Sequence, residues 1–257
     1  MRTALVRSVS RRIAEAELTY LDRQPIDYEL AASQHREYEQ LLESVGCKIV
    51  RVADAPDHPD GVFVEDAAIV LDEVAVITRP GAESRRGEVE SVEEVLKRYR
   101  SIRKIEAPGT MDGGDILHAG RTLFAGRSTR TNDDGIAQLR AVVEPFGYQV
   151  TATDFRGCLH LKTAVTAIDD RTLLVNPDWI AGIDGFEMIA IDPSEPFAAN
   201  VLRVGETLVA MDEHPRTCAL LRARGYTVRA AASSEMLKAE AGVTCGSIIF
   251  ENTITTV

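Results

Sequence analysis

The sequence predicts an α/β protein built from repeated modules around an axis, and two observations indicate this. Four segments share a strand–turn–strand pattern, in which two β-rich runs flank a short polar turn. Most of these hairpins are followed by a segment with helical spacing and then by a third β-rich run. The unit of hairpin, helix and strand recurs about five times at a period of roughly 40–50 residues, which is typical of propellers and other arrays.

The four clear hairpins are "DAAIVLDEVAVITRP" from Asp66, "GDILHAGRTLFAGRS" from Gly114, "TAVTAIDDRTLLVNP" from Thr163 and "NVLRVGETLVAMDE" from Asn200. A fifth, weaker copy is "GSIIFENTITTV" at residues 246–257. The alternative is a divergent α/β domain with chance regularity. The shared length and turn chemistry of four hairpins favours the repeat.

The helices between the hairpins are indicated by apolar spacing and by capping residues. Residues 85–100 place Val89, Val92, Val95 and Leu96 at helical intervals. Further helices are expected at 27–46, at 132–147 with Asn132 as a cap, and at 214–226. The β-rich runs that follow the helices are residues 47–54, 103–108, 148–154 and 226–231.

Composition excludes several classes of protein. The chain has 257 residues and no linker-like segment, so we expect a single domain over residues 1–257. No apolar run approaches the ~18 residues of a membrane span, and the N-terminus lacks the features of a signal peptide. The formal charge of −11 argues against a nucleic-acid partner.

The four cysteines are far apart and show no zinc-site spacing. Cys47 and Cys218 lie in apolar patterns that predict buried core thiols. A chain of this size needs no disulfides, so a cytoplasmic location is expected.

Five chemically distinctive residues stand just before the five hairpins. In chain order they are Asp66, Asp112, His160, Asn200 and Cys245, at intervals of 46, 48, 40 and 45 residues. Each alone has an ordinary structural explanation, such as a core thiol or a tight "DGGD" turn. If the repeats surround an axis, however, residues at one phase of the repeat converge on it. The common phase therefore predicts a central pocket.

This set of side chains suits attack on a guanidinium carbon. A thiolate of Cys245 is a nucleophile, and His160 can move protons to and from a reacting group. Asp66 and Asp112 would hold a planar cation by charge-assisted hydrogen bonds. A protease would instead need oxyanion donors.

Arginines close to two expected helix starts form a second feature. Arg85 and Arg86 occupy one such place, and Arg127 and Arg130 occupy the equivalent place one repeat later. Arginine beside free helix-terminal N–H groups can bind a carboxylate, although a solvated helix cap is the ordinary explanation for any single arginine. Carboxylates at one end and arginines at the other would suit a zwitterionic amino acid with a cationic side chain.

The chain resembles the dimethylarginine dimethylaminohydrolases of the guanidine-modifying (pentein) superfamily. The matching stretches run in family order over nearly the whole chain. They are "FVED" (63–66), "ITRPGAESRRGE" (77–88), "APGTMDGGDIL" (107–117), "RTN" (130–132), "LHLKT" (159–163), "AAN" (198–200) and "TC" with a serine two residues on (244–247). Some bacterial members carry "EAGD" in place of "DGGD", so Asp112 is one methylene shorter than the glutamate found there.

The resemblance implies a five-bladed α/β propeller of ββαβ modules around a central active site. It implies hydrolysis of Nω-methylated arginines to L-citrulline and dimethylamine or methylamine, without a metal or an organic cofactor. Carried over by position, Cys245 is the nucleophile and His160 the general acid/base. The substrate-binding positions are Asp66 and Asp112 for the guanidinium, Arg85 and Arg130 for the carboxylate, and Leu18, Asp60 and Glu65 as further contacts.

The implied reaction passes through a covalent Cys S-alkylthiouronium intermediate. The nearest rival function is an arginine deiminase, but those enzymes carry an acid where this chain has Lys162, and they are longer. A non-catalytic arginine-derivative binding protein on the same scaffold is the rival from another class. A small-molecule partner is expected, and exposed apolar positions on an outer helix would suit a homodimer.

Overall fold

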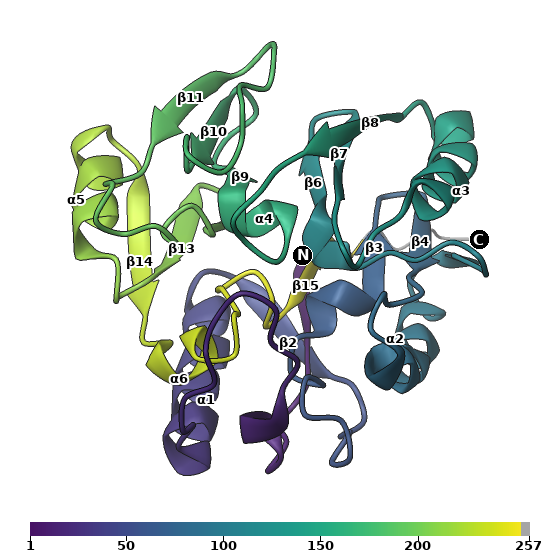
Figure 1. Ribbon diagram of the computed structural model, residues 1–257, viewed down its shortest axis with the longest axis horizontal. Coiled ribbons are helices and arrows are strands. Elements are labelled where there is room, and N and C mark those ends of the chain that lie inside the picture. Colours follow the sequence, from purple (N-terminus) through teal and green to yellow (C-terminus); the bar gives the residue numbers. More distant parts are fainter. Residues whose placement is uncertain (253–257) are drawn as a thin grey trace.

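The computed structural model describes residues 1–252 and, within them, five three-stranded sheets arranged around a centre (Figure 1). In each sheet the middle strand pairs antiparallel with one neighbour and parallel with the other. The predicted five-module α/β propeller is therefore confirmed, and so are the four predicted hairpins.

Two consecutive modules follow the predicted order of hairpin, helix and strand. The first comprises β3 (Ala68–Val70), β4 (Val74–Ile77), η3 (Glu83–Glu88), α2 (Val89–Leu96) and β5 (Ser101–Lys104). The second comprises β6 (Ile116–Ala119), β7 (Thr122–Arg127), α3 (Asp133–Val143), η5 (Glu144–Phe146) and β8 (Gln149–Asp154). Asn132 caps α3 as expected, because its side chain accepts a hydrogen bond from the backbone N–H of Gly135 at 2.8 Å.

The next module lacks a helix between its second and third strands. It comprises β9 (Val165–Ala167), β10 (Thr172–Val175) and β11 (Glu187–Ala190), with turns and irregular backbone over residues 176–186. The module after it is regular. It comprises β12 (Leu202–Val204), β13 (Thr207–Met211), α5 (Pro215–Ala223) and β14 (Thr227–Ala231), and the short helix α6 (Ser234–Leu237) follows.

The last module is assembled from both ends of the chain. Its members are β15 (Ile248–Glu251), β1 (Arg2–Val6), η1 (Ile13–Glu15), α1 (Tyr28–Ser44) and β2 (Cys47–Arg51). β15 pairs antiparallel with β1, so Thr3 lies opposite Phe250, and residues 253–257 lie outside the described part of the chain. The N-terminal strand thus pairs with the first half of the hairpin predicted at residues 246–257 and closes the ring.

Buried apolar side chains pack between neighbouring modules. One group, for example, joins Val76 of β4 to Leu123 of β7 and Leu139 of α3. Cys47 and Cys218 are buried among apolar neighbours, as predicted. Within residues 1–252 no helix has the length and apolar character needed to cross a membrane.

A short helical turn or bend precedes the first strand of each module. Three of these segments are η2 (Val64–Ala67), η4 (Gly113–Asp115) and α4 (Leu161–Ala164). In Figure 1, α4 lies near the centre of the ring of modules. These segments bring the functional side chains towards the axis.

Candidate active site

The predicted repeat phase is observed. Asp66 lies in η2, Asp112 directly precedes η4, and His160 directly precedes α4. Cys245 lies in turns that lead into β15. Each residue therefore stands just before the first strand of its module.

His160 and two aspartates form a buried cluster. His160 Nε2 lies 3.1 Å from Asp112 Oδ2, and His160 Nδ1 lies 3.9 Å from Asp66 Oδ1. Burial alone lowers the pKa of His160, but Asp66 and the hydrogen bond to Asp112 outweigh it and raise this pKa to about 9. His160 is therefore an imidazolium near neutral pH and can donate a proton.

Asp66 is held as a carboxylate. Burial would raise its pKa, but the charges of His160 and Arg85 lower this pKa well below the usual range. Asp66 accepts hydrogen bonds from Arg85 at 2.7 Å and from the backbone N–H of Gly114 at 2.9 Å. A side chain at Gly114 would collide with both Asp66 and His160, so close approach explains this glycine of the "DGGD" motif.

Asp115 closes the "DGGD" motif and was not selected from the sequence. It is fully buried and accepts hydrogen bonds from the backbone N–H of Leu161 at 3.0 Å and from Ser128 Oγ at 2.6 Å. Burial raises its pKa to about 6 against the opposing charge of His160. Asp115 thus fixes Leu161, the residue that follows His160. In the sequence, its position directly after two glycines is the feature that could have indicated a buried functional carboxylate.

Cys245 is buried, and its resting form is the thiol. Burial and the charges of Glu65 and Asp66 raise the pKa of Cys245 far above the usual value. Its Sγ accepts a hydrogen bond from the backbone N–H of Gly242 at 3.3 Å. A nearby positive charge is therefore needed to form the thiolate.

Close packing against α1 explains the glycine at position 246. A Cβ atom there would lie 3.1 Å from Tyr38 Cε1 and 3.8 Å from His35 Cε1. Tyr38 in turn donates a hydrogen bond to the carbonyl oxygen of Val243 at 2.7 Å. The absence of a side chain at Gly246 lets the "GVTCGS" segment lie against α1.

Cys245 and His160 line one pocket of about 290 Å³ of empty volume. The other lining residues are Glu17, Asp60, Phe63, Asp66, Arg85, Arg130, Leu159, Ala239, Glu240 and Ala241. They come from segments spread from the N-terminal loop to the residues before β15. The pocket therefore combines a thiol, an imidazolium, carboxylates and arginines, and it contains three of the five residues at the common repeat phase, Asp66, His160 and Cys245.

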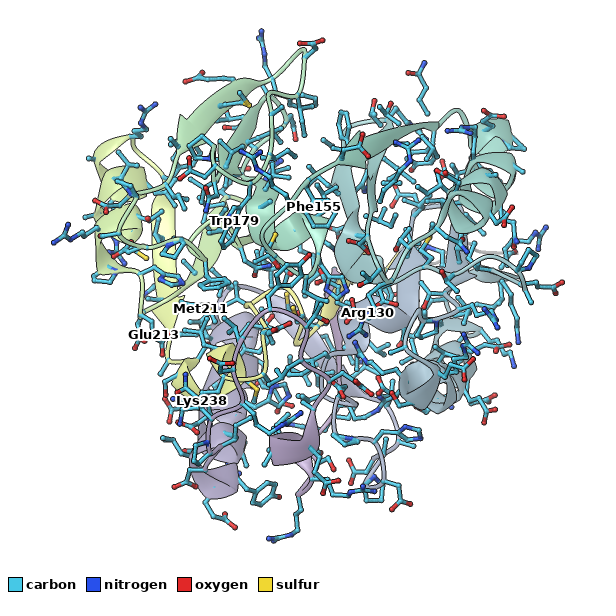
Figure 2. The ribbon with its side chains drawn as sticks, in the orientation of Figure 1. Arg130, Phe155, Trp179, Met211, Glu213 and Lys238 are labelled. Atoms are coloured by element: carbon cyan, nitrogen blue, oxygen red, sulfur yellow. The ribbon has the colours of Figure 1, made fainter. Side chains whose placement is uncertain are left out.

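The two arginines predicted for carboxylate binding differ in their surroundings. The Arg85 guanidinium is buried and bonded to Asp66 at 2.7 Å and Glu88 at 2.9 Å, and it also donates to two backbone carbonyl groups. In contrast, Arg130 is buried with its NH1 group lacking a hydrogen-bond partner within residues 1–252 and lying 3.8 Å from Asp112 Oδ2. Figure 2 places Arg130 near the centre of the molecule. Arg130 has a donor to offer, whereas Arg85 serves as a counter-ion of Asp66.

Asp112 does not reach the pocket that Cys245 lines. Its side chain is fully buried, accepts from the backbone N–H of Gly81 at 3.0 Å and contacts His160. The sequence predicted that Asp112 contacts a substrate guanidinium, but no atom of its carboxylate is exposed to the pocket in this structure. Its position instead fits orientation of His160.

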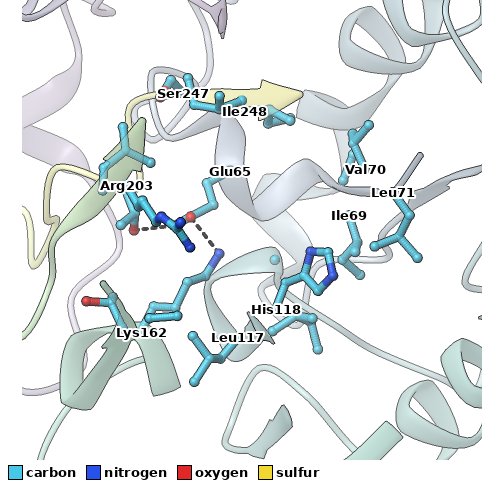
Figure 3. Close-up of a pocket in the computed structure, with 18 of the residues that line it drawn as sticks. Glu65, Ile69, Val70, Leu71, Leu117, His118, Lys162, Arg203, Ser247 and Ile248 are labelled. Carbon is cyan, nitrogen blue, oxygen red and sulfur yellow. Dashed lines mark hydrogen bonds and ion pairs between the residues drawn. The ribbon is translucent and has the colours of Figure 1, made fainter. Parts of the chain in front are cut away.

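Glu65, a further predicted contact, lines a different hollow of about 950 Å³ (Figure 3). Its carboxylate accepts hydrogen bonds from Lys162 Nζ at 2.6 Å and Thr244 Oγ1 at 2.7 Å. Burial raises the pKa of Glu65, and Lys162 opposes this. Glu65 therefore lies outside the Cys245 pocket. Its backbone N–H donates to the carbonyl oxygen of Cys245 at 3.2 Å, and burial and the charge of Glu65 raise the pKa of the Cys245 thiol.

Asp60 holds the loop that follows η1, at the residue directly before Leu18. Asp60 lines the pocket and accepts from the backbone N–H of Glu17 at 3.1 Å, and burial raises its pKa to about 6. Leu18 follows Glu17 directly and is half-buried. Asp60 therefore faces the pocket, and Leu18 follows the residue whose backbone Asp60 holds.

Asn200, the fifth residue of the repeat phase, supports the nucleophile's segment. Its side chain accepts from the backbone N–H of Thr244 at 3.0 Å and donates to Thr244 Oγ1 at 3.0 Å and to the carbonyl oxygen of Lys162 at 3.1 Å. Asn200 thus holds Thr244, the residue directly before Cys245, and does not bond to Cys245 itself.

Among residues 1–252, the three side chains that could converge on a metal ion are Asp66, Asp112 and His160, whose ligand atoms lie within 4.8 Å of one another. Their mutual ion pairs already account for this proximity.

Comparisons with known proteins agree with this geometry. The family model of "N,N dimethylarginine dimethylhydrolase, eukaryotic" matches residues 17–191. A relative from Streptomyces coelicolor, an N(G),N(G)-dimethylarginine dimethylaminohydrolase, is 42% identical over 95% of both chains. A relative of the same name from Pseudomonas aeruginosa is 36% identical over 87% of this chain and 90% of its own.

Solved structures give the same result. A cysteine-to-serine mutant of the Pseudomonas aeruginosa protein, complexed with citrulline, has a TM-score of 0.92 at 34% identity and covers 96% of this chain and 98% of its own. A histidine-to-glycine variant of a dimethylarginine dimethylaminohydrolase, an adduct with S-methyl-L-thiocitrulline, has a TM-score of 0.91 at 34% identity and covers 97% of this chain and 100% of its own. The N-terminal domain of ArgZ, a cyanobacterial arginine dihydrolase, has a TM-score of 0.85 at 19% identity over 97% of this chain and 98% of its own, which shows a shared fold alone.

Proposed function

Since the chain belongs to the dimethylarginine dimethylaminohydrolase family, we propose that it hydrolyses Nω-methylated arginines to L-citrulline and dimethylamine or methylamine. Asymmetric dimethylarginine and monomethylarginine are the substrates. The observation that carries the proposal is the shared pocket, in which a buried thiol and an imidazolium meet the carboxylate of Asp66. The enzyme is a hydrolase that acts on the C–N bond of an amidine-type group.

Substrate binding follows from the charges in the pocket. Asp66 stays ionised and faces the pocket, so it binds the guanidinium, while the carboxylate of Asp60 suits the α-ammonium group. Arg130 has the unpaired donor and binds the α-carboxylate. Arg85 contributes by fixing Asp66, and Leu18 contributes from the position that follows Glu17, whose backbone N–H Asp60 holds.

The first half-reaction begins when the guanidinium enters. Its positive charge offsets the field of Asp66 and Glu65, which lowers the pKa of the Cys245 thiol, so the thiol releases its proton to solvent and becomes the thiolate. The sulfur attacks the guanidinium carbon and forms a C–S bond. His160 donates its proton to the departing nitrogen, the C–N bond breaks, and the alkylamine leaves. A covalent S-alkylthiouronium remains on Cys245.

The second half-reaction uses the imidazole that the first has left neutral. His160 takes a proton from water, and the oxygen attacks the same carbon. The C–S bond breaks, the hydroxyl proton of the collapsing adduct passes to the departing thiolate, and citrulline leaves, so the thiol and the imidazolium are restored. Asp112 keeps His160 oriented through both steps by its hydrogen bond at 3.1 Å. No metal or organic cofactor enters this scheme.

The pocket also bears on domain organisation. Its lining residues extend from Glu17 to Cys245, so the site needs almost the whole length of the chain. This supports a single catalytic domain over residues 1–257.

The test is citrulline release from asymmetric dimethylarginine, monomethylarginine and arginine, for the wild type and for Cys245→Ser. We expect turnover of the methylated substrates, little turnover of arginine, and none by the serine variant. Comparable turnover of arginine would reassign the chain to the deiminase-type reaction. Tight binding of methylarginines without turnover by the wild type would identify a binding protein.

A further inference from the structure

Glu240 stands five residues before Cys245 and binds a distant loop. Its carboxylate accepts hydrogen bonds from three consecutive backbone N–H groups, those of Thr19 at 3.0 Å, Tyr20 at 2.5 Å and Leu21 at 2.5 Å. Consecutive N–H groups that converge in this way form an anion-binding concavity. Here the anion is a side chain of the protein itself.

The backbone of Glu240 is strained. Its φ is +57°, and no other non-glycine residue among residues 1–252 has a positive φ. L-residues with a long side chain seldom adopt this conformation, and they keep it only where the surroundings stabilise it. The three hydrogen bonds to the loop supply that stabilisation, so the loop contact holds Glu240 in its strained backbone conformation.

The loop that Glu240 binds reaches the Cys245 pocket at Glu17. Glu17, Asp60 and Glu240 all line this pocket. On one side of Leu18, the backbone N–H of Glu17 bonds to Asp60, and Ser84 Oγ donates to the Glu17 carboxylate at 2.6 Å. On the other side, Thr19 is bound to Glu240. Leu18 is thus fixed between two carboxylate contacts.

The far end of the loop has separate anchors. Lys238 Nζ donates to the carbonyl oxygen of Pro25 at 3.0 Å, and Glu235 accepts from the backbone N–H of Asp27 at 2.8 Å. Figure 2 marks Lys238 beside the short helix α6. Loss of the Glu240 contact would therefore release residues 19–21 while residues 25–27 stay attached.

We propose that Glu240 is a positioning residue that latches residues 17–21 beside the pocket and so sets the affinity for the amino-acid end of the substrate. Without its carboxylate, three backbone donors turn to water and Leu18 loses one of the two contacts that fix it. The affinity part rests on the proposed function. The latch itself does not, because it consists of hydrogen bonds between Glu240 and the backbone of residues 19–21.

Two substitutions separate the latch from a merely structural role. Glycine and asparagine both tolerate a positive φ, so Glu240→Gly and Glu240→Asn add no backbone strain. Glycine has no side chain, and the asparagine side chain is too short to reach the loop. Glu240→Gln keeps the reach and one acceptor oxygen and should restore part of the effect. Lys238→Ala, which removes an anchor at the far end, is the matched control.

The first measurement is amide hydrogen exchange in the unliganded proteins. We expect the amides of residues 19–21 to exchange faster by about tenfold or more in the glycine and asparagine variants. The amides of α1 should keep their protection, and Lys238→Ala should leave residues 19–21 unchanged. Unchanged exchange of residues 19–21 in Glu240→Gly would overturn the latch.

The second measurement is steady-state kinetics with asymmetric dimethylarginine. We expect KM to rise about fivefold to tenfold in the glycine and asparagine variants, with a smaller change in kcat, and to rise less in Glu240→Gln. An unchanged KM despite faster loop exchange would overturn the link to substrate affinity. Failure of the wild type to turn over methylarginines would refute the proposed function, and the exchange experiment would still decide the latch.

Discussion

His160 Nε2 lies 3.1 Å from Asp112 Oδ2, inside a cluster that also places His160 Nδ1 3.9 Å from Asp66. Two carboxylates thus face both nitrogens of one buried ring. This arrangement explains why the imidazolium persists although burial alone would remove its proton. It also gives Asp112 a function that does not require contact with the substrate.

The first prediction concerns the alkaline limb of activity. The pKa of His160 is raised to about 9, so the general acid is present below that pH and is lost as the pH rises through it. We expect kcat/KM to fall above pH about 9. Asp112→Asn, which removes one of the charges that raise this pKa, should move the limb to lower pH. An alkaline limb that does not shift in Asp112→Asn would contradict this assignment, and NMR titration of His160 in Cys245→Ser gives the direct check.

The same cluster predicts a pH dependence of stability. The folded-state pKa of His160 lies above its ordinary value of 6.5, so its contribution is fully present below about pH 6.5 and disappears as the pH rises through about 9. We expect the free energy of unfolding to decline over this interval in the wild type. The decline should be smaller in His160→Gln, measured by urea unfolding at several pH values. Identical slopes in both proteins would show that other groups control stability there.

The second relationship to test is the coupling between substrate charge and the Cys245 thiol. The resting thiol is protonated because burial, Glu65 and Asp66 raise its pKa, and a bound guanidinium opposes the two charges. Binding of a non-hydrolysed cationic arginine analogue should therefore release up to one proton. Calorimetry in buffers of different ionisation enthalpy measures this number, and Cys245→Ser should show no release of this kind. Equal release by both proteins would place the proton elsewhere.

Arg130 and Arg85 should respond differently to substitution. Arg130→Ala removes an unpaired donor, so KM should rise about tenfold or more with a small effect on folding. Arg85→Ala leaves Asp66 and Glu88 buried without their counter-ion, so it should lower the free energy of unfolding by about 3–5 kcal/mol. Arg86→Ala, at a more exposed neighbouring arginine, is the control for both. A larger rise in KM for a stably folded Arg85→Ala than for Arg130→Ala would reverse these roles.

Asn200→Ala tests the support of the nucleophile. The substitution leaves the backbone N–H of Thr244 and the carbonyl oxygen of Lys162 without the partners they have here. We expect a loss of about 2–4 kcal/mol in the free energy of unfolding and a lower kcat. Denaturant unfolding and single-turnover rates provide the two measurements. Wild-type values in both would show that Asn200 does not hold the Cys245 segment.

The sequence by itself determined the hairpins, their period and the phase of the chemically distinctive residues. Hairpins and capped helices depend on local patterns, such as alternation and turn residues, which the chain carries within a few positions. The common phase of Asp66, His160 and Cys245 then implied a shared pocket, and the motifs indicated the family. These inferences need only the repeat, because equivalent points of repeated modules meet at the axis.

Only the tertiary structure decided which charged group pairs with which. Arg85 and Arg130 look equivalent along the chain, yet Arg85 is enclosed by Asp66 and Glu88 while Arg130 keeps a donor free. The closure of the last sheet by β1, and the bond from Glu240 to a loop some 220 residues earlier, were equally invisible in the sequence. Such contacts depend on the reach of single side chains and on how distant segments pack, and no local pattern encodes either.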